Sequence, residues 1–374
     1  MLTSLIAILS LLAWAYLALF RGRFWQPLLP PFASAPDNWP SVDIIVPARD
    51  EAASLPQSLP ALLAQDYPGA WRIILVDDHS TDGTAAIVRN IMEQKNAENR
   101  LTIIDAPVLP PGWNGKLAAL DAGLKQSKAD YVLFTDADIL HPARSLRDQV
   151  ARAVKFKLDL TSLMAKLHCE SFAEQWLIPP FVFFFAMLYP FRSTNDPASG
   201  IAGAAGGVML VKRAALDNIG GLAAIKSELI VDCALARAIK RSGGSIHLAL
   251  AYDIKSLRVY TSITDVWNLV ARTAYTQLRH SPLLLGATLI GMGIVFIAPA
   301  LLPVHGGHLA TEAGLAAWLA MTLLYMPTVN FYRLSIVWAV MLPAAALVYI
   351  GATIDSARLY WQGRGGQWKG RTQV

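Results

Sequence analysis

Apolar residues follow two patterns along this chain: long uncharged runs near its two ends, and short runs separated by polar segments between about residues 41 and 279. The first long run, Leu2–Phe20, holds 19 residues without a charge. That length is sufficient to cross a bilayer as a helix. Three further apolar runs of spanning length, or nearly so, follow at residues 283–304, 313–329 and 334–354. The pattern predicts membrane helices on both sides of a central domain.

The central domain alternates short β-rich runs with amphipathic stretches. Strands are expected at residues 42–47, 72–76 and 101–104 and in the run that begins at Tyr131, with helices at residues 55–65, 85–93 and 115–126. Strands that alternate with helices indicate an α/β fold, in which right-handed crossovers build a parallel sheet that is buried on both faces. Ligands bind such sheets at the carboxyl ends of the strands. The residues that follow each strand are therefore the candidates for a site.

The segment after this α/β pattern is less regular. Residues 172–191 are rich in Phe, Trp and Leu, but Pro179, Pro180 and Pro190 interrupt them, which favours an interfacial or re-entrant helix pair. A buried core remains the alternative. The other elements expected before residue 280 are a glycine-rich stretch at 200–207, a strand at 208–211, a helix at 233–241 and an amphipathic segment at 263–279.

Composition supports the membrane interpretation. Of the 374 residues, 54% are hydrophobic and 16% charged, and the mean hydropathy of +0.40 is too high for an ordinary soluble enzyme. The formal net charge of +5 would also be compatible with nucleic-acid binding, but the basic residues gather beside hydrophobic segments. Anionic lipid headgroups are the better-matched partner there, so no nucleic acid is expected. The two cysteines, Cys169 and Cys233, form no disulfide framework and fit a reducing compartment.

Charges beside the apolar runs predict an orientation in the membrane. Arg21 and Arg23 follow the first run and no positive residue precedes it, so residues 1–25 are expected to be an anchor rather than a signal peptide, with the following domain in the cytoplasm. If all three later runs crossed, the basic tail at residues 358–374 would emerge outside, although its charges argue for inside. A re-entrant segment at residues 313–329 would remove the conflict, and the sequence leaves this open.

Candidate chemistry is concentrated at the ends of the predicted strands. The run that begins at Tyr131 ends in Asp136 and Asp138, and two carboxylates at i and i+2 can turn toward one hard cation while leaving coordination sites free for phosphates. This arrangement suits a metal-bound nucleotide diphosphate. The alternative is an Asp-Ala-Asp sequence that only begins a loop. Two earlier strands end in Pro47-Ala48-Arg49 and Asp77-Asp78.

Four motifs in this order and spacing resemble those of the family 2 glycosyltransferases of GT-A fold. They are Pro47-Ala48-Arg49-Asp50-Glu51, the segment VDDHSTDGT at residues 76–84, Gly115-Lys116 and Asp136-Ala137-Asp138. The resemblance covers residues 41–280 and implies a Rossmann-like GT-A domain between the anchor and C-terminal transmembrane helices at residues 281–357. Within the family, the chain is most similar to the membrane-bound hopene-associated glycosyltransferases of bacteria, themselves similar to ceramide glucosyltransferases. Residues 271–279, the C-terminal apolar runs and the closing residues 367–371 carry this narrower similarity.

The resemblance implies how a nucleotide sugar, most often a uridine one, would bind. Pro47, Ala48, Arg49 and Glu51 in the loop after the first strand would hold the base and ribose together with Asp78. For Asp77 two roles stay open: contact with the nucleotide, or capping of the next turn through Ser80 and Thr81. Lys116 would meet the diphosphate with its own charge and that of a helix start. A solvated surface lysine is the alternative.

The resemblance also implies the catalytic roles. Asp138, with Asp136 beside it, would carry Mg²⁺ or Mn²⁺ against the phosphates, and the metal would act as a Lewis acid for the leaving group. Asp232 matches the family's third aspartate and would be the general base of an inverting displacement. The alternative is that Asp232 caps a helix that begins at Cys233.

Two arginines are further candidates for substrate phosphate. Related enzymes carry a Gln/Arg-x-x-Arg-Trp signature, which here reads Thr276-Gln277-Leu278-Arg279-His280. Arg279 is kept in that register, but the replacement of Trp by His280 and of the first residue by Thr276 argues against a processive polymer synthase. Arg272 could contact phosphate, or be a solvated or lipid-facing arginine.

A sugar-transfer site beside several apolar helices predicts a lipid acceptor at a bacterial inner membrane, lined by residues 176–191 and 200–207. The narrower resemblance implies a hopanoid. Polyprenyl phosphate, diacylglycerol, a carotenoid and ceramide remain alternative acceptors. Two alternatives come from other functional classes. One is a catalytically inactive membrane protein that uses the fold as a binding module, and the other is a nucleotidyltransferase, which shares the sheet architecture. The latter normally has a glycine-rich phosphate loop after the first strand, where this chain has Pro47-Ala48-Arg49-Asp50-Glu51.

Overall fold

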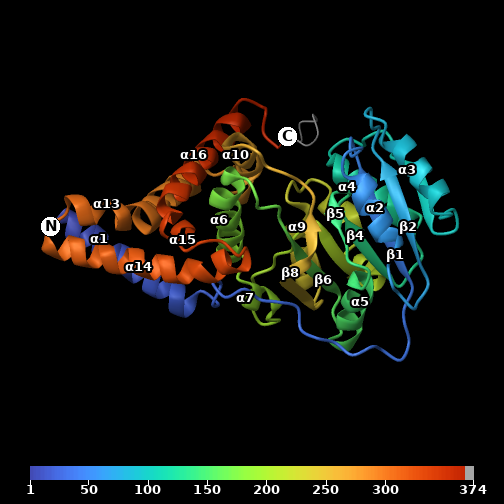
Figure 1. Ribbon diagram of the computed structural model, residues 1–374, viewed down its shortest axis with the longest axis horizontal. Coiled ribbons are helices and arrows are strands. Elements are labelled where there is room, and N and C mark those ends of the chain that lie inside the picture. Colours follow the sequence, from blue (N-terminus) through green and yellow to red (C-terminus); the bar gives the residue numbers. More distant parts are fainter. Residues whose placement is uncertain (367–374) are drawn as a thin grey trace.

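A computed structural model describes residues 1–366, so the predicted closing motif at residues 367–371 lies outside the described part. The chain forms three regions in a row: a helical bundle that includes the N-terminus, an intermediate layer of helices, and an α/β region around a sheet (Figure 1).

The sheet has eight strands in the order β3-β2-β1-β4-β7-β6-β8-β5. The strands are β1 (Val42–Ala48), β2 (Trp71–Asp77), β3 (Leu101–Asp105), β4 (Tyr131–Thr135), β5 (Ile139–Leu140), β6 (Leu160–Lys166), β7 (Val208–Lys212) and β8 (Ile246–Ser256). The first four strands are parallel, as predicted. The sheet as a whole is mixed, because β7 lies antiparallel to both β4 and β6. The carboxyl ends of β1, β2 and β4 therefore meet at one edge.

Both faces of this sheet are covered, which explains why its strands are apolar without alternation. Ile44 belongs to the core on one face and its neighbour Ile45 to the core on the other. The first core includes residues of α2 (Leu55–Leu63), α3 (Thr84–Gln94) and α5 (Ser145–Lys155). The second includes residues of α4 (Gly115–Lys125), α8 (Arg213–Asn218), the 3₁₀ helix η1 (Leu222–Ile225) and α9 (Val231–Arg241).

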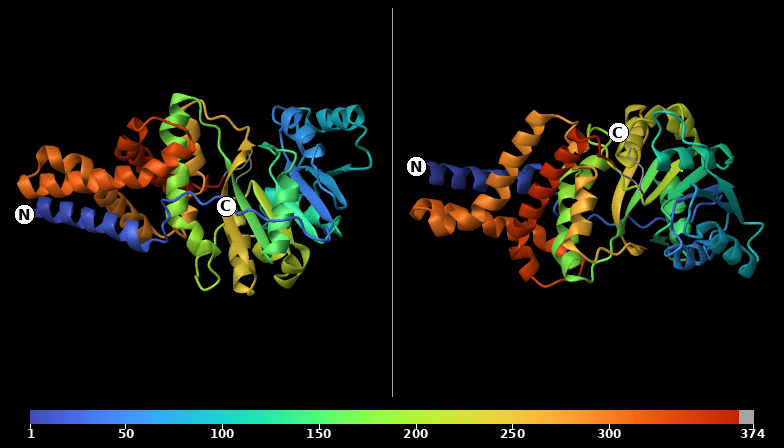
Figure 2. Two further views of the ribbon diagram at one scale, coloured as in Figure 1. Left: turned by 60° about the horizontal axis from the view of Figure 1, so that its bottom comes forward. Right: turned by 90° about the horizontal axis from the view of Figure 1, so that it is seen from above.

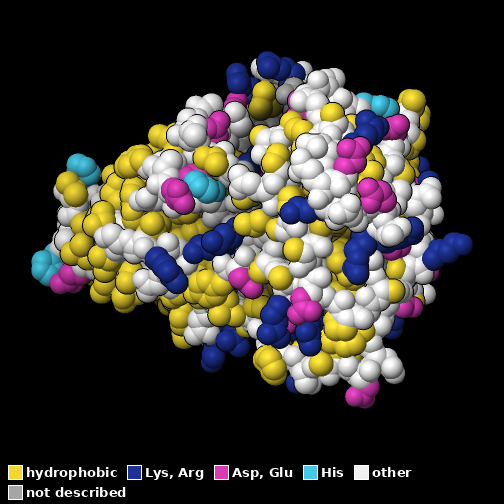
Figure 3. Space-filling model, turned by 45° about the vertical axis from the view of Figure 1, so that its right-hand side comes forward, with side chains coloured by type: hydrophobic (Ala, Val, Ile, Leu, Met, Phe, Trp, Pro, Cys, Tyr) yellow, Lys and Arg dark blue, Asp and Glu magenta, His cyan; other side chains and the backbone are white. Residues whose placement is uncertain are grey.

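Three helices are long and apolar enough to cross a membrane. They are α1 (Leu2–Phe20), a continuous helix at Pro282–His305 and α14 (His308–Phe331). The second consists of α12 (Pro282–Met292), a π-helical turn η2 (Gly293–Ile297) and α13 (Ala298–His305). These helices pack side by side (Figure 2). Hydrophobic side chains cover much of this end of the surface, whereas charged residues gather over the sheet-bearing region (Figure 3).

An intermediate layer consists mainly of α6 (Phe172–Leu188), α10 (Ile263–Ala271) and α16 (Leu342–Trp361), which pack on one another. The predicted run at residues 334–354 is divided between the short α15 (Val337–Val340) and α16, and α16 is not one of the three helices of spanning length and apolarity. It runs at an angle to the bundle (Figures 1 and 2). Two short helices, α7 (Phe191–Asn195) and α11 (Ala274–Gln277), complete the described elements.

The expected break at Pro179 and Pro180 is wrong, because α6 continues through both prolines. Each proline removes one backbone hydrogen bond of the helix. Ile178 and Phe183 beside them are fully buried, and this packing outweighs the loss. Pro190 does separate α6 from the short α7.

Candidate active site

The loops after β1 and β2 hold each other in place. The backbone N–H of Asp78 donates to the carbonyl of Ala48 at 2.8 Å, and the Arg49 guanidinium donates to the Asp78 carbonyl at 2.7 Å. Arg49 also lies 3.5 Å from the carboxylate of Asp78, which is only 2% exposed. Asp77 accepts hydrogen bonds from Ser80, so the capping role is present, while a contact with nucleotide stays a prediction.

The remaining predicted donor-side residues lie at the same edge. Pro47 pairs with Val76 in the register of β1 and β2. The backbone N–H of Glu51 donates to Thr84 Oγ1 at 2.8 Å, which ties the β1 loop to the start of α3. The four residues of the first motif chosen from sequence are thus brought together with Asp78.

Lys116 lies in the first turn of α4 and forms an ion pair with Asp136. The helix start is fixed by Asn114, whose Oδ1 accepts from the backbone N–H of Lys116 at 2.9 Å. Burial, together with the nearby carboxylates of Asp136 and Glu51, raises the pKa of Asp138 to about 6, against the opposing charges of Arg258 and Lys116. The three acidic groups therefore repel one another in this part of the site.

This charge distribution fits a divalent cation. Carboxylates that lie close together, as Asp136 and Glu51 do to Asp138, are stabilised when a cation is shared between them. Among residues 1–366, no three His, Cys, Asp or Glu side chains are arranged to hold a metal. Asp136 and Asp138 could thus supply two oxygen ligands, and substrate phosphates would complete the coordination, as is usual for Mg²⁺.

Asp232 lies in the first turn of α9, which begins at Val231, so it is not the N-cap residue. Its Oδ2 accepts from the backbone N–H of Gly206 at 2.8 Å, and its Oδ1 accepts from that of Cys233 at 2.8 Å. The residue keeps some contact with solvent. Protein nevertheless surrounds the carboxyl group, and this desolvation raises its pKa. A fixed carboxylate with a raised pKa is suited to accept a proton.

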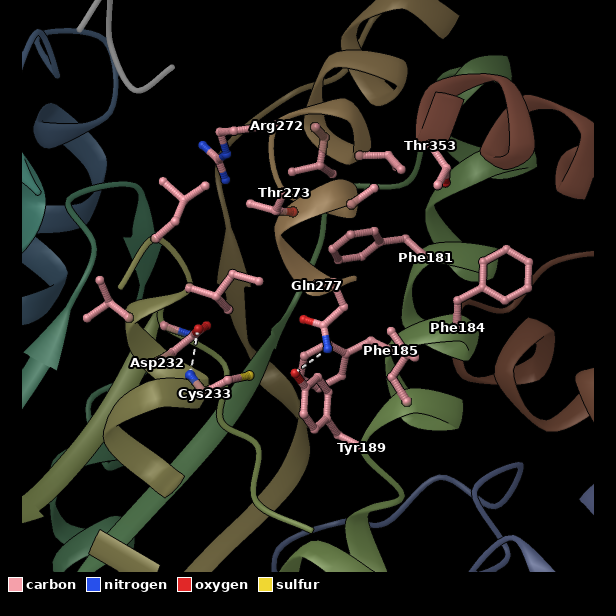
Figure 4. A pocket seen from close by; sticks show the side chains of 18 of the residues that line it. Phe181, Phe184, Phe185, Tyr189, Asp232, Cys233, Arg272, Thr273, Gln277 and Thr353 are labelled. Carbon is pink, nitrogen blue, oxygen red and sulfur yellow. Dashed lines mark hydrogen bonds between the residues drawn. The ribbon is translucent and has the colours of Figure 1, made fainter. Parts of the chain in front are cut away.

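Asp232 opens onto a cavity of about 570 Å³ that joins two chemically different environments. Lys116 and Asp136 line its polar end together with Asp232. Its other wall comes from the helices of the intermediate layer and from the Pro282–His305 span. That wall includes Phe181, Phe184, Phe185, Met292, Phe296, Tyr349 and Thr353. In Figure 4 Phe181 of α6 points toward the side of the cavity on which Asp232 lies, whereas Phe184 points away from it and packs on Phe296 and Tyr349.

The two predicted arginines differ in how they meet the cavity. Arg272 lines it and also lines a neighbouring pocket of about 790 Å³, whereas Arg279 lines only that neighbouring pocket and is not brought to Lys116 and Asp136. A hydrogen bond of 2.6 Å from Gln277 to the Tyr189 hydroxyl stands where the two pockets adjoin (Figure 4).

One charged residue of the cavity was missed by the sequence analysis. Arg258 follows β8 and belongs to no motif, so only the fold brings it to the cavity. Tyr189, in contrast, lies within the stretch at residues 176–191 that was expected to line the acceptor site, with a buried core as the alternative. The strand β8 was not expected from the sequence, so no local signal pointed to Arg258.

Comparison with known proteins identifies the domain. The sequence model described as "Glycosyl transferase family 2" matches residues 43–220. An N-acetylglucosaminyltransferase of Mesorhizobium japonicum is 31% identical over 160 residues, which are 40% of this chain and 34% of that protein. An undecaprenyl-phosphate 4-deoxy-4-formamido-L-arabinose transferase of Pseudomonas aeruginosa is 34% identical over 116 residues, 30% of this chain and 32% of that protein. The chain thus spans about one third of the length of these relatives.

A similar solved structure extends the comparison to the fold. A mannosyltransferase from Pyrobaculum calidifontis, solved in complex with GDP-Man and Mn²⁺, has a TM-score of 0.58 at 20% identity, covering 94% of this chain and 99% of that one. At this identity the likeness concerns the fold alone. It agrees with the mixed sheet and its flanking helices. Residues 43–220 are therefore a family 2 glycosyl transferase domain, built on the GT-A fold.

Proposed function

We propose that this protein is a membrane-bound inverting glycosyltransferase that moves a sugar from a nucleotide sugar, most simply a UDP-sugar, to a lipid acceptor. The observation that carries the proposal is the cavity that leads from Asp136 and Asp232 to an aromatic wall formed partly by a candidate membrane span. A soluble acceptor would gain nothing from this wall. A lipid would bury its apolar part there and leave its reacting hydroxyl or phosphate at the polar end.

Each group of side chains would have its own role in the reaction. The loops around Arg49 and Asp78 would hold the nucleoside, and Lys116 would attract the diphosphate at the start of α4. A divalent metal held by Asp136 and Asp138 would offset the charge that builds on the departing nucleoside diphosphate. Asp232, fixed by two backbone N–H groups, would take the proton from the acceptor on the side opposite the leaving group.

The chemical class of the lipid acceptor is suggested only by similarity to other enzymes. The resemblance to hopene-associated enzymes favours a hopanoid. The similarity to an undecaprenyl-phosphate transferase favours a polyprenyl phosphate as the second candidate.

The test is to incubate the detergent-purified protein with a panel of labelled nucleotide sugars and a bacterial lipid extract, with and without chelator. Labelled glycolipid that requires the metal supports the proposal. No transfer and no nucleotide-sugar hydrolysis under any condition would leave a binding module instead.

The three candidate spans also support an orientation. Arg21 and Arg23 follow α1, Arg279 precedes α12 and Arg333 follows α14, so all four lie at the ends of the spans nearest the sheet. By the positive-inside rule, the glycosyltransferase domain would face the cytoplasm. With three crossings, α16 and the start of the basic tail would lie on that same side, and no re-entrant segment is needed.

Cysteine labelling tests this orientation. The reagent is a membrane-impermeant thiol reagent, and the background has Cys169 and Cys233 replaced by Ser. Gly307→Cys, between α13 and α14, should be labelled in intact cells, and Arg364→Cys only after permeabilisation. Labelling of Arg364→Cys in intact cells would contradict the three-span arrangement.

A further inference from the structure

Two arginines of the described residues, Arg258 and Arg272, line the polar end of the cavity without a salt bridge, although the charge of Arg258 acts on the nearby Asp138. Within residues 1–366, neither Arg258 nor Arg272 forms a salt bridge, and the hydrogen bonds that they make come from their backbone N–H groups. The guanidinium of Arg258 lies 6.0 Å from the centre of the Tyr260 ring. Burial lowers the pKa of Arg272, and the nearby charge of Arg258 lowers it further. The two side chains thus place like charges close together.

The acidic residues of the cavity are already engaged elsewhere. Asp136 pairs with Lys116, and Asp232 accepts from two backbone N–H groups. Asp136 and Asp232 act on Arg272 only from beyond salt-bridge distance. Two neighbouring guanidinium groups in a partly desolvated cavity are stabilised when an anion binds between them and offsets their charge. The planar guanidinium group donates paired hydrogen bonds to phosphate and carboxylate oxygens, and these are the anions that it binds best.

We propose that Arg258 and Arg272 together form a phosphate-binding site at the polar end of the cavity. This proposal rests on the function proposed above and narrows it. The loops expected to hold the nucleoside, around Arg49 and Asp78, do not line the cavity, whereas the aromatic wall of α6 does. Lys116 and Asp136, which the proposed function assigns to the diphosphate of the donor, line the same cavity, so the two arginines supply charge for a second phosphate, carried by the acceptor lipid. The diphosphate of the donor is the other source of the same chemistry.

Equilibrium binding in detergent tests the site without requiring turnover. The probes are radiolabelled farnesyl phosphate, farnesol as its uncharged counterpart, and UDP with Mn²⁺. The unmodified protein should bind farnesyl phosphate more tightly than farnesol. Arg258→Gln and Arg272→Gln should each weaken the binding of farnesyl phosphate about tenfold, because one charge-assisted contact is lost, and should leave the binding of farnesol unchanged. Arg241→Gln, an exposed position at the end of α9, is the control with the same loss of charge.

Each outcome separates the possible sources. Weaker binding of farnesyl phosphate in the arginine variants assigns the site to an acceptor phosphate. Weaker binding of UDP alone assigns the site to the donor and overturns the lipid assignment. If both arginine variants bind all three probes like the unmodified protein, the phosphate site does not exist. Arg258→Lys and Arg272→Lys keep the charge, so their partial recovery of binding would exclude misfolding as the cause. Arginine-dependent binding without any sugar transfer would refute only the proposed enzymatic function.

Discussion

Replacement of Asp232 by Asn tests the proposed general base. The carboxylate accepts one backbone N–H at each oxygen, from Gly206 and from Cys233, both at 2.8 Å. Asn offers only one oxygen, so its NH₂ group must face the other N–H, which costs about 1–3 kcal/mol in a desolvated position. The variant also loses the proton acceptor, which should lower kcat by about 10²–10⁴-fold, or about 3–5 kcal/mol of barrier.

The assay separates these two effects. Initial rates at saturating acceptor give kcat and the KM for the nucleotide sugar, and that KM should stay unchanged because Asp232 lies away from the nucleoside loops. Desolvation raises the pKa of Asp232, and the base must be ionised, so activity of the unmodified protein should fall as the pH drops through a value above the usual 3.9 or so. Asp232→Glu keeps a carboxylate and should retain more activity than Asn. A loss of kcat below tenfold in Asp232→Asn would refute the assignment.

Three further perturbations follow from the geometry. A Cβ on Gly206 would lie 3.2 Å from Asp232 Oδ2, so Gly206→Ala should lower kcat about tenfold with unchanged UDP affinity. Gly200→Ala meets no atom within 4 Å and is its matched control; equal effects in the two variants would contradict the argument. Asp138→Ala should abolish Mn²⁺ binding measured by calorimetry in the presence of UDP, and unchanged Mn²⁺ affinity would remove Asp138 from the metal site. Glu174, at the start of α6, accepts hydrogen bonds from three backbone N–H groups and from His168. Burial alone would raise its pKa, but these hydrogen bonds lower the pKa to about 2, below the ordinary 4.5. Its contribution of about 3 kcal/mol is present above pH 4.5 and lost as the pH falls toward 2, so denaturant unfolding should show this dependence in the unmodified protein and not in Glu174→Gln.

The sheet could be predicted because its signal is local. Ile44 and Ile45 enter cores on opposite faces, so a strand buried on both sides must be apolar throughout, and the sequence of β1 displays this directly. Once the first strands are taken as parallel, their carboxyl ends must coincide. That rule alone places Asp78 and Asp136 at one edge before any coordinates are known.

The rest of the cavity depends on contacts that no local pattern records. Arg258 reaches the cavity because β8 ends beside Asp138: the backbone N–H of Leu257 donates to the Asp138 carbonyl at 2.8 Å. This pairing joins residues that are more than a hundred positions apart. For the same reason, Pro179 and Pro180 suggested a break in α6, since the packing that maintains the helix comes from other segments.

The last apolar run shows why hydropathy alone could not decide the topology. A window over residues 334–354 is apolar whether the helix crosses a bilayer or lies against other helices. What distinguishes the two is the end of α16, where Asp355 accepts a hydrogen bond of 3.0 Å from the Trp267 indole of α10 and pairs with Arg358. The hydrogen bond from Trp267 to Asp355 ties α16 to α10 in the layer beside the sheet, and α10 carries the chain toward Arg272 at the cavity. The helix that the sequence offered as a fourth crossing is therefore better explained as a wall of the cavity, to which it contributes Tyr349 and Thr353.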